Sequence, residues 1–370
     1  MHTQWESLAN EHILGIAPYE PGKPIEELER ELGIAHPIKL ASNENPLPPS
    51  DRVQKAIIAA LATANRYPDG SGFYLRQALA KRHGVSQDQV ILGNGSNELI
   101  ELLVRTFLKP GDEAVVPHPS FPFYPMIVQA AGGIRVMVML KDHRLDLDAM
   151  ARAVTPLTKV VFIANPNNPT GTIVTASEVE HFISRLPPRT IVIFDEAYTE
   201  FAQGPDFPDT LGLVKEGRKV VVLRTFSKAT SLAGLRVGYG IADADAVALM
   251  NRIRQPFNVN SLAQVAALAA LEDEAHVLEC VRMIEAGRHY LYDEFKRLGI
   301  AYVPSRANFI LVDVGRSASD IYQKLLHEGV IVRPLTSFGM ETALRVTVGT
   351  PEENRKLIKA LRRVLGFGDV

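Results

Sequence analysis

Five short apolar runs, rich in valine and isoleucine, recur through the middle of the chain and constrain its fold more than any other feature. They are QVILGN to residue 94, DEAVVPH to 118, KVVFIAN to 165, TIVIFDE to 196 and KVVVLRT to 225. Because apolar and polar residues do not alternate within them, they are typical of strands covered on both faces. Amphipathic helical patterns at 97–107 and 177–186 separate some of the runs. The sequence therefore predicts an α/β fold with a mostly parallel, doubly wound sheet between helices.

The last hundred residues have a different pattern and predict a second, smaller domain. A long helical region at 261–298 precedes AYVPSRANFILVDV, a helix around SDIYQKLLHEG, the strands VIVRP and ALRVTVG, and a final helix ENRKLIKALRRVL. We expect a large domain over 45–264 and a small α+β domain formed by 1–44 and 265–370. The proline-rich NENPLPPS at 43–50 is expected to connect them.

Composition narrows the range of partners to small molecules. The 370 residues are 46% apolar and carry a formal net charge of −2, which gives no electrostatic reason to bind nucleic acid. No apolar stretch approaches the length needed to cross a bilayer, and MHTQWESLANEH lacks the features of a secretory signal. The single cysteine, Cys280, is expected to be buried and inert, which fits a reducing cytoplasm. The histidines show no paired ligand spacing, so no metal site is expected.

Polar residues gather where four of the expected strands end. GNGSNE follows QVIL, NPNNPTG follows KVVFIA, DEAY follows TIVIF, and TFSK follows KVVVLR. Because ligands of parallel sheets bind outside the carboxyl ends of the strands, these segments are expected to form one site. Turn chemistry alone does not explain four such strand ends.

The segment after QVIL has three interpretations. Gly93, Gly95 and Ser96 offer bare amides at the positive end of a helix, which suits a phosphate. An ordinary strand-to-helix turn with a Ser or Asn cap explains the same residues. They also resemble half of a dinucleotide fingerprint, with Glu98 in place of the third glycine. A nicotinamide-dependent dehydrogenase therefore stays an alternative, although its ribose-binding acid is not evident after DEAVV and Lys228 would be unexplained.

Asp195 and Lys228 predict cofactor chemistry. Asp195 closes an apolar strand, where an unpaired carboxylate is costly, so either a protonated ring nitrogen or a structural ion pair is expected beside it. Lys228 follows an apolar run, and reduced solvation favours the neutral amine that forms an imine with an aldehyde cofactor; a surface lysine is the alternative. Thr225, Ser227 and Arg236 supply hydroxyls and a guanidinium that suit a phosphate dianion.

Together, ASNENP, NPNNPTG, DEAY and TFSKATSLAGLRVGYG resemble the fold-type I aminotransferases, which use pyridoxal 5′-phosphate, over essentially the whole chain. APYEPGK, NRYPDGSG, GNGSNELI, IVRP and LRVTVGT are most similar to the histidinol-phosphate aminotransferase family. The resemblance implies an aspartate-aminotransferase-like fold, with a large cofactor-binding domain and a small α+β domain, and a homodimer.

The resemblance also assigns roles by position. It implies that Lys228 holds the cofactor as a Schiff base, Asp195 pairs with the ring nitrogen, and Asn168 with Tyr198 holds the ring hydroxyl. Phe121 is expected to stack on the ring; relatives often have tyrosine there. The cofactor phosphate is expected to lie among Gly95, Ser96, Asn97, Thr225, Ser227 and Arg236, with Tyr67 reaching it from the other subunit. The residues expected at the substrate are Tyr19 as a lid, Arg333 and Arg345 as anion-binding groups, and Asn43 and Asn308.

The implied reaction is transamination of histidinol phosphate with 2-oxoglutarate, which gives imidazole acetol phosphate and glutamate in histidine biosynthesis. Lys228 is expected to move the proton at the substrate Cα. Arg345, with Arg333, is expected to bind the phosphate of one substrate and the carboxylate of the other; surface ion pairing is the alternative for both. An aromatic amino acid aminotransferase and a phosphothreonine decarboxylase of the same fold stay open as alternative functions.

Overall fold

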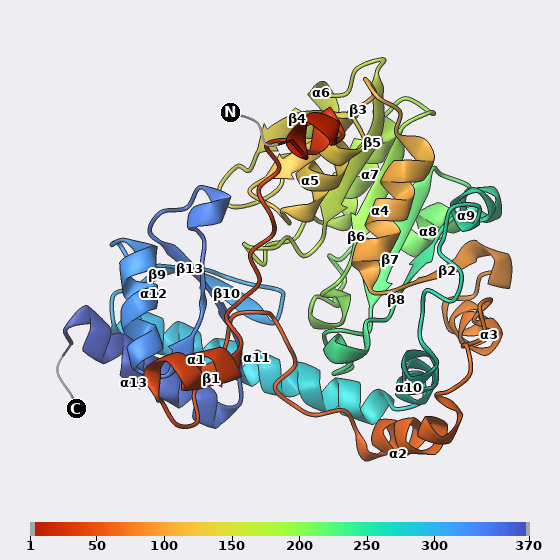
Figure 1. Cartoon of the computed structure of the whole chain (residues 1–370). Coiled ribbons are helices and arrows are strands. Elements are labelled where there is room, and N and C mark those ends of the chain that lie inside the picture. Colours follow the sequence, from red (N-terminus) through yellow and green to blue (C-terminus); the bar gives the residue numbers. More distant parts are fainter. Residues whose placement is uncertain (1–3, 368–370) are drawn as a thin grey trace.

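The computed structural model describes residues 4–367, which form a larger and a smaller region, each around its own sheet (Figure 1). The sheet of the larger region has seven strands in the order β2-β8-β7-β6-β5-β3-β4. Their bounds are Val90–Gly93 (β2), Glu113–His118 (β3), Ile134–Met139 (β4), Thr158–Ala164 (β5), Ile191–Asp195 (β6), Val220–Thr225 (β7) and Gly238–Ile241 (β8). Neighbouring strands are parallel except where β8 pairs with β2 and β7. The expected α/β fold with a mostly parallel sheet is confirmed.

Two strands, β4 and β8, were not expected from the sequence. β8 contains Gly238 and Gly240, so it lacks the continuous apolar side chains by which the other strands were recognised. A Cβ atom on Gly238 would lie 2.7 Å from the backbone N of Ser96, so this strand needs glycine where α4 begins. β4 forms an edge of the sheet, and four of its six residues are exposed.

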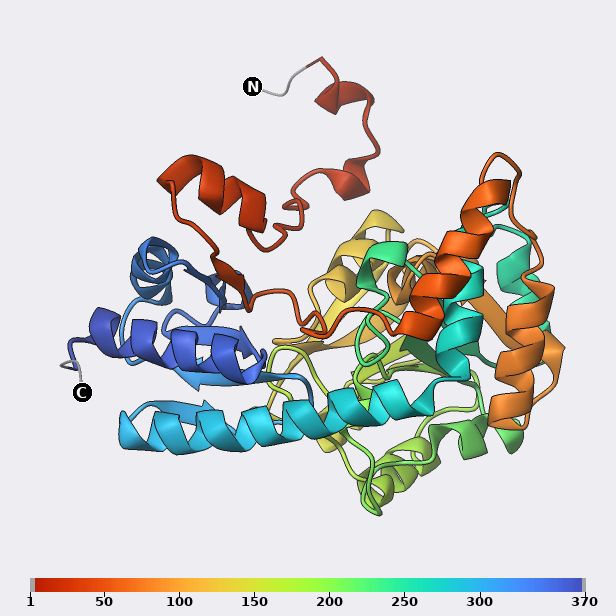
Figure 2. The same ribbon diagram turned by 90° about the horizontal axis from the view of Figure 1, so that it is seen from below.

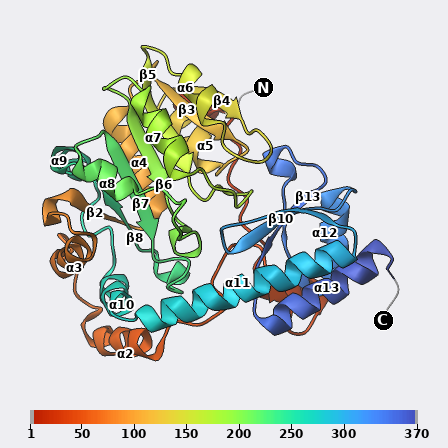
Figure 3. The same cartoon turned by 180° about the vertical axis from the view of Figure 1, so that it is seen from behind.

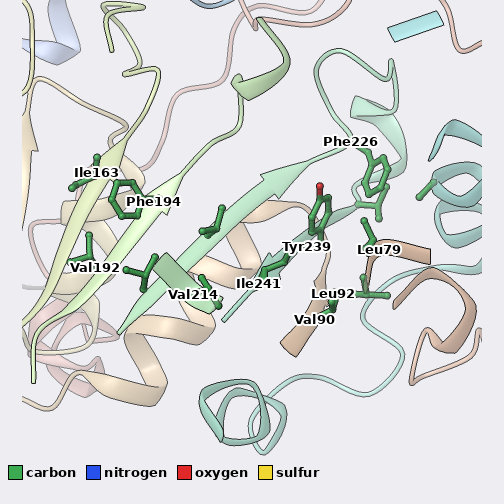
Figure 4. Packing of buried hydrophobic residues seen from close by; sticks show 14 of the residues in the cluster. Leu79, Val90, Leu92, Ile163, Val192, Phe194, Val214, Phe226, Tyr239 and Ile241 are labelled. Atoms are coloured by element: carbon green, nitrogen blue, oxygen red, sulfur yellow. The ribbon is translucent and has the colours of Figure 1, made fainter. Parts of the chain in front are cut away.

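Helices cover both faces of the larger sheet. One face packs against α4 (Ser96–Phe107), α5 (Phe123–Ala130) and α9 (Ala244–Asn251). The other packs against α3 (Phe73–His83), α6 (Leu147–Arg152), α7 (Ala176–Ser184), α8 (Thr210–Lys215) and α10 (Ser261–Leu271). Side chains of β6 alternate between these cores: Val192 and Phe194 face the second set of helices (Figure 4), and Ile193 faces the first. Both faces of the strands are therefore apolar, as the sequence predicted.

The smaller region has a four-stranded antiparallel sheet in the order β12-β13-β10-β9. Its strands are Ala301–Val303 (β9), Phe309–Asp313 (β10), Arg333–Pro334 (β12) and Ala343–Thr347 (β13). A separate parallel pair joins β1 (Ile38–Lys39) to β11 (Val330–Ile331). The helices are α1 (Ile25–Leu32), α11 (Glu274–Arg297), α12 (Ala318–His327) and α13 (Pro351–Leu365). α11 extends from the smaller region toward α10 and α2 (Asp51–Ala60) of the larger one (Figures 2 and 3).

The long helical region expected over 261–298 consists of two helices. α10 ends at Leu271 and α11 begins at Glu274. Asp273 caps α11, because its Oδ1 accepts a hydrogen bond from the backbone N of His276 at 3.3 Å. α10 packs against α2 and α3, and Ala266 and Ala270 belong to the core of the larger region. The expected boundary between 264 and 265 therefore falls inside a helix of the larger region.

The amino-terminal segment crosses from the larger region to the smaller one (Figures 1 and 2). A short 3₁₀ helix, η2 (Glu11–Ile13), packs against α5, and Gln129 Nε2 donates to the carbonyl O of Leu14 at 3.4 Å. Farther along, Leu28 of α1 packs with Leu326 and Ile331. The part of the chain expected to join the small domain includes residues 1–3, which lie outside the described residues. In the described chain, no helix is both long and apolar enough to cross a membrane.

Candidate active site

A pocket of about 200 Å³ lies at the carboxyl ends of β5, β6 and β7, where the sequence predicted a common site. Its lining brings together residues from all four predicted strand ends and from the amino-terminal segment. The predicted site residues in this lining are Tyr19, Ser96, Asn97, Phe121, Asn168, Asp195, Tyr198, Thr225, Ser227, Lys228 and Arg236. Gly95, Asn43, Asn308, Arg333 and Arg345 lie next to this lining, and Tyr67 lies elsewhere.

Lys228 follows β7 and extends its amine into the pocket. Its Nζ is 3.4 Å from the carbonyl O of Ser42 and 5.5 Å from the ring centroid of Tyr198. Burial lowers the pKa of Lys228 to about 8, and the nearby cation of Arg345 acts in the same direction. A substantial fraction of the amine is therefore neutral near pH 8, which is the form that can attack a carbonyl or accept a proton.

Asp195 ends β6 beside Lys228 and is held by two donors. Its Oδ2 accepts from the hydroxyl of Tyr124 at 2.7 Å, and its Oδ1 accepts from the backbone N of Ala197 at 3.2 Å. Burial raises the pKa of Asp195, although both hydrogen bonds oppose that effect. Tyr124 was not expected at the site; it is fully buried and stacks on Phe162 at 4.7 Å between ring centroids. Its only sequence signal is one hydroxyl among the apolar residues of α5.

A cradle of hydroxyl, guanidinium and backbone donors lies between the ends of β2 and β7. Thr225 Oγ1 is 3.0 Å from Ser227 Oγ, and Arg236 Nη1 donates to Ser227 Oγ at 3.3 Å. Gly95 precedes α4 at a φ of 76°, and a Cβ atom there would lie 2.5 Å from Arg236 Nη2. Glycine is thus needed for the guanidinium to approach the amino end of α4, whose first turn begins at Ser96. This donor set fits a phosphate dianion.

Asn168 and Tyr198 lie on another side of the pocket and are both held by residues of distant segments. Arg345 Nη1 donates to Asn168 Oδ1 at 2.6 Å. Asn43 Nδ2 donates to the hydroxyl of Tyr198 at 3.0 Å. Burial raises the pKa of Tyr198 to about 12, so its hydroxyl keeps its proton at neutral pH. Asn168 and Tyr198 therefore present polar groups to the pocket and are each held by a residue outside its lining.

Arg345 of β13 is buried without a carboxylate. It is 6% exposed, and its Nη2 donates to the carbonyl O of Ala41 at 2.5 Å, while Nε has no hydrogen-bond partner among the described residues. Burial lowers the pKa of Arg345, and within residues 4–367 no acidic side chain comes within 4.0 Å to form an ion pair. A buried cation with neutral partners can take an anionic ligand.

Arg333 and two aromatic residues border the same side. Arg333 of β12 is 8% exposed, and its guanidinium carbon is 5.7 Å from the ring centroid of Tyr19. Tyr19 also meets Phe121 edge to face at 6.5 Å between ring centroids, so it spans the entrance between the two regions. Asn308 is fully buried and donates through Nδ2 to the carbonyl O of Asn43 at 3.0 Å, which places it behind the pocket lining.

Tyr67 is not brought to the pocket of its own chain. Its side chain is 82% exposed and stacks on Phe257 at 4.7 Å between ring centroids. A contact with the pocket of the same chain is therefore excluded in this arrangement, and the expected contact across a subunit boundary stays a prediction.

Comparison with known proteins identifies the class. Residues 35–361 match the family described as aminotransferase class I and II. The chain is also similar to a solved structure of histidinol-phosphate aminotransferase from Sinorhizobium meliloti in complex with pyridoxal-5′-phosphate. That similarity has a TM-score of 0.89 and 30% sequence identity, and covers 97% of this chain and 98% of the other. The fold and the family define an aminotransferase that depends on pyridoxal 5′-phosphate, as expected.

Two relatives narrow the class further. The chain is 49% identical over 356 residues to a histidinol-phosphate aminotransferase of Moorella thermoacetica, covering 96% of this chain and 92% of the relative. It is 50% identical over 361 residues to histidinol-phosphate aminotransferase 2 of Pseudomonas fluorescens, covering 97% and 98%. The chain therefore belongs to the histidinol-phosphate aminotransferases, as its motifs predicted.

Proposed function

We propose that this protein transfers the amino group of histidinol phosphate to 2-oxoglutarate, giving imidazole acetol phosphate and glutamate, a step of histidine biosynthesis. The names of relatives about half identical over nearly the full chain support the substrates. The observation that carries the proposal is Arg345, a buried cation without a carboxylate partner, beside the amine of Lys228. Each substrate carries an anionic group and either an amine or a carbonyl. One site that holds the Arg345 guanidinium and the Lys228 amine can therefore bind both substrates.

Pyridoxal 5′-phosphate supplies an aldehyde that captures the substrate amine and a ring that accepts the electron pair when the Cα–H bond breaks. Asp195 is proposed to hold the proton on the ring nitrogen, which keeps the ring electron-withdrawing. Lys228 is proposed to take the Cα proton on Nζ and to return it at the cofactor carbon. Ser227, Thr225 and Arg236 would hold the phosphate through the cradle at the end of β7.

The anion of each substrate is proposed to bind at Arg345, with Arg333 at the edge of the same site. The two arginines lie opposite each other on β13 and β12, which pair in an antiparallel register. Phosphate and carboxylate both present oxygens that a guanidinium can bind through two hydrogen bonds. Tyr19 spans the entrance from Arg333 to Phe121 and would exclude water from the site. Asn43 and Asn308 hold this side of the pocket from behind.

A homodimer is proposed on the basis of an exposed apolar surface on the larger region. Its members lie on α2, α3 and the segments next to them: Ile58, Leu61, Tyr67, Phe73, Tyr74 and Phe257. Apolar surfaces of this kind mark interaction sites. A second copy would cover the surface and allow Tyr67 to reach the partner's cofactor phosphate. A cytoplasmic location is proposed from the single, buried Cys280.

The two-domain division is proposed with one adjustment. The larger domain would begin at residue 45, as expected, but would end between α10 and α11. α10 packs into the core of the larger sheet, whereas Cys280 and Ile284 of α11 pack into the core of the smaller region.

The substrates can be tested with the purified protein carrying its cofactor. Histidinol phosphate, phenylalanine and phosphothreonine are added separately, and the absorbance of the bound cofactor is followed, with glutamate release measured after adding 2-oxoglutarate. Fastest conversion with histidinol phosphate supports the proposal. No conversion with histidinol phosphate contradicts it. Faster conversion of phenylalanine would favour an aromatic aminotransferase, and carbon dioxide released from phosphothreonine without an oxo acid would favour a decarboxylase.

A further inference from the structure

Asn43 and Thr347 lie behind the pocket, and neither has a chemical step in the reaction proposed above. They are 1% and 3% exposed. Asn43 belongs to a segment of three residues that each contact a different site residue. The carbonyl O of Ala41 accepts from Arg345, and that of Ser42 accepts from Lys228. The side chain of Asn43 contacts the hydroxyl of Tyr198. What this third contact does to Tyr198 depends on which atom donates the proton.

The direction of each hydrogen bond around Asn43 follows from one backbone group. The backbone N of Asn43 can only donate, and it does so to Thr347 Oγ1 at 2.9 Å. The Thr347 hydroxyl is then free to donate its one proton, and Asn43 Oδ1 lies 3.1 Å away as the acceptor. With Oδ1 fixed as an acceptor, the amide NH₂ faces Tyr198 and donates to its hydroxyl O at 3.0 Å. The Tyr198 proton is therefore free to point elsewhere.

The opposite amide orientation is disfavoured by the same geometry. If the NH₂ of Asn43 faced Thr347, the threonine oxygen would receive two donors, and its own proton would have no other hydrogen-bond acceptor among the described residues. A buried hydroxyl proton without an acceptor destabilises the arrangement that contains it. The orientation in which Asn43 donates to Tyr198 leaves only the Tyr198 proton without an acceptor among the described residues, and Tyr198 lines the pocket, where a ligand can accept that proton.

The backbone holds Asn43 in the conformation that this arrangement needs. Its φ is 54°, in the left-handed region, which asparagine adopts more readily than most residues. Asn308 Nδ2 donates to its carbonyl O at 3.0 Å, so both backbone groups of Asn43 are bound by the smaller region. Thr347 lies two residues after Arg345 on β13, which puts both side chains on the same face of that strand.

We propose that Asn43 and Thr347 are positioning residues that orient the hydroxyl of Tyr198, so that its proton points into the pocket toward an oxygen of the cofactor ring. The proposal rests on the role proposed for Tyr198, and it gives Asn43 a positioning role in place of the substrate contact expected from the sequence. Thr347 sets the orientation of Asn43, and Asn43 sets that of Tyr198. Neither has to touch the cofactor or the substrate.

The expected consequence is a shift in how the bound cofactor titrates. A proton donated to the ring oxygen stabilises that oxygen as an anion, so the bound cofactor loses its own proton at a lower pH. When Tyr198 no longer donates, the cofactor keeps that proton to a higher pH. The change is visible as an upward shift of the pH at which the absorption spectrum of the bound cofactor changes, without any substrate.

The test measures this spectral pH midpoint in Thr347→Val and Asn43→Asp, each alone and combined with Tyr198→Phe. Valine matches threonine in shape but cannot donate, and aspartate can accept from Tyr198 but cannot donate to it. Each single change is expected to raise the midpoint by about one pH unit. Thr347→Ser keeps the hydroxyl and is expected to retain the original midpoint. Thr190→Val is the matched control, because the hydroxyl of Thr190 is buried and has no hydrogen-bond partner in the described part of the chain.

Coupling to Tyr198 separates positioning from a general structural effect. If Asn43 and Thr347 act through the Tyr198 hydroxyl, neither change shifts the midpoint further once Tyr198 is phenylalanine. An unchanged midpoint in both single variants, or full additivity with Tyr198→Phe, overturns the proposal. The midpoint is measured separately for the variants at Asn43 and at Thr347. If one variant no longer binds the cofactor, the midpoint of the other variant still tests the proposal. Because no substrate is used, failure of histidinol phosphate as a substrate would leave this result intact.

Discussion

Arg224 of the large sheet and Arg345 of the small one are both largely withdrawn from water, but among the described residues only Arg224 has a carboxylate partner. Arg224 of β7 donates through Nε and Nη2 to Glu196 Oε2 at 3.0 and 2.8 Å. Burial alone would lower the pKa of Arg224, but Glu196 reverses this and holds it above its ordinary value. Arg345 has only amide and carbonyl oxygens as partners, and burial lowers its pKa.

The difference separates structural charge from charge kept for a ligand. Glu196 and Arg224 are the chain neighbours of Asp195 and Thr225, and their side chains pair with each other outside the pocket lining. Thr210 also donates to Glu196 at 2.5 Å, so this ion pair is complete within the chain. Around the pocket, the charges of Lys228, Asp195 and Arg345 are not paired with one another. A bound cofactor and a substrate anion would supply partners for these charges.

The largest effect is expected from Lys228→Ala, which removes the amine that would move the Cα proton. Turnover with histidinol phosphate should fall by ~10³-fold or more, because no other base is placed at that position. Thr210→Val, in the structural ion-pair cluster, should change turnover by less than ~10-fold, since it touches no pocket group. Steady-state kinetics on both variants measures the two losses of turnover. Equal losses would mean that the pocket and the ion-pair cluster do not differ in their effect on the reaction.

Arg224→Met should lower the free energy of unfolding by about 3 kcal/mol, because it leaves Glu196 buried without its cation. The double change of Glu196→Gln with Arg224→Met should recover a large part of this loss, since no charge then remains unpaired. Urea unfolding of the single and the double variant measures the loss of unfolding free energy and its recovery. No recovery in the double variant would mean that packing of the arginine, rather than its charge, supports this region.

The stability of the protein without cofactor should depend on pH through Lys228. Its pKa is lowered in the folded state from 10.5 to about 8, so the unfolded chain binds the extra proton between these values. The lysine therefore destabilises the fold fully below pH 8, and this penalty disappears as the pH rises to 10.5. Lys228→Met should melt at a higher temperature than the unaltered protein at pH 7, and the gap should close by about pH 10.5. A gap that is constant over this range contradicts the shift.

The smallest effect on stability is expected from Arg345→Met, the same substitution at the unpaired arginine. No carboxylate is left behind, and only the carbonyl of Ala41 and the amide of Asn168 lose a donor. The free energy of unfolding should change by only about 1 kcal/mol, because removing an unpaired buried cation offsets much of the cost of the two acceptors that lose their donor. A loss as large as that of Arg224→Met, measured in the same urea titration, would show that Arg345 is also structural.

Much of the site could be predicted because parallel strands end at one edge of a sheet. The motifs after β2, β5, β6 and β7 therefore met in space although they are far apart in the sequence. Tyr124 and Thr347 could not be found in this way, because their roles depend on which side chains of distant segments they meet. The break before α11 had a signal in Asp273, a helix-capping residue type within the expected helix. β8 had no such signal in the sequence, because it has glycine where the start of α4 leaves no room for a side chain.

The central claim is that Arg345 is left without a carboxylate so that it can bind the anion of either substrate. The direct test is to follow both half-reactions of Arg345→Met carrying its cofactor, with histidinol phosphate in one and 2-oxoglutarate in the other, below saturation. Each should slow by about 10²-fold, while the cofactor stays bound and its spectrum is retained. If either half-reaction kept its original rate, Arg345 would not be the shared anchor.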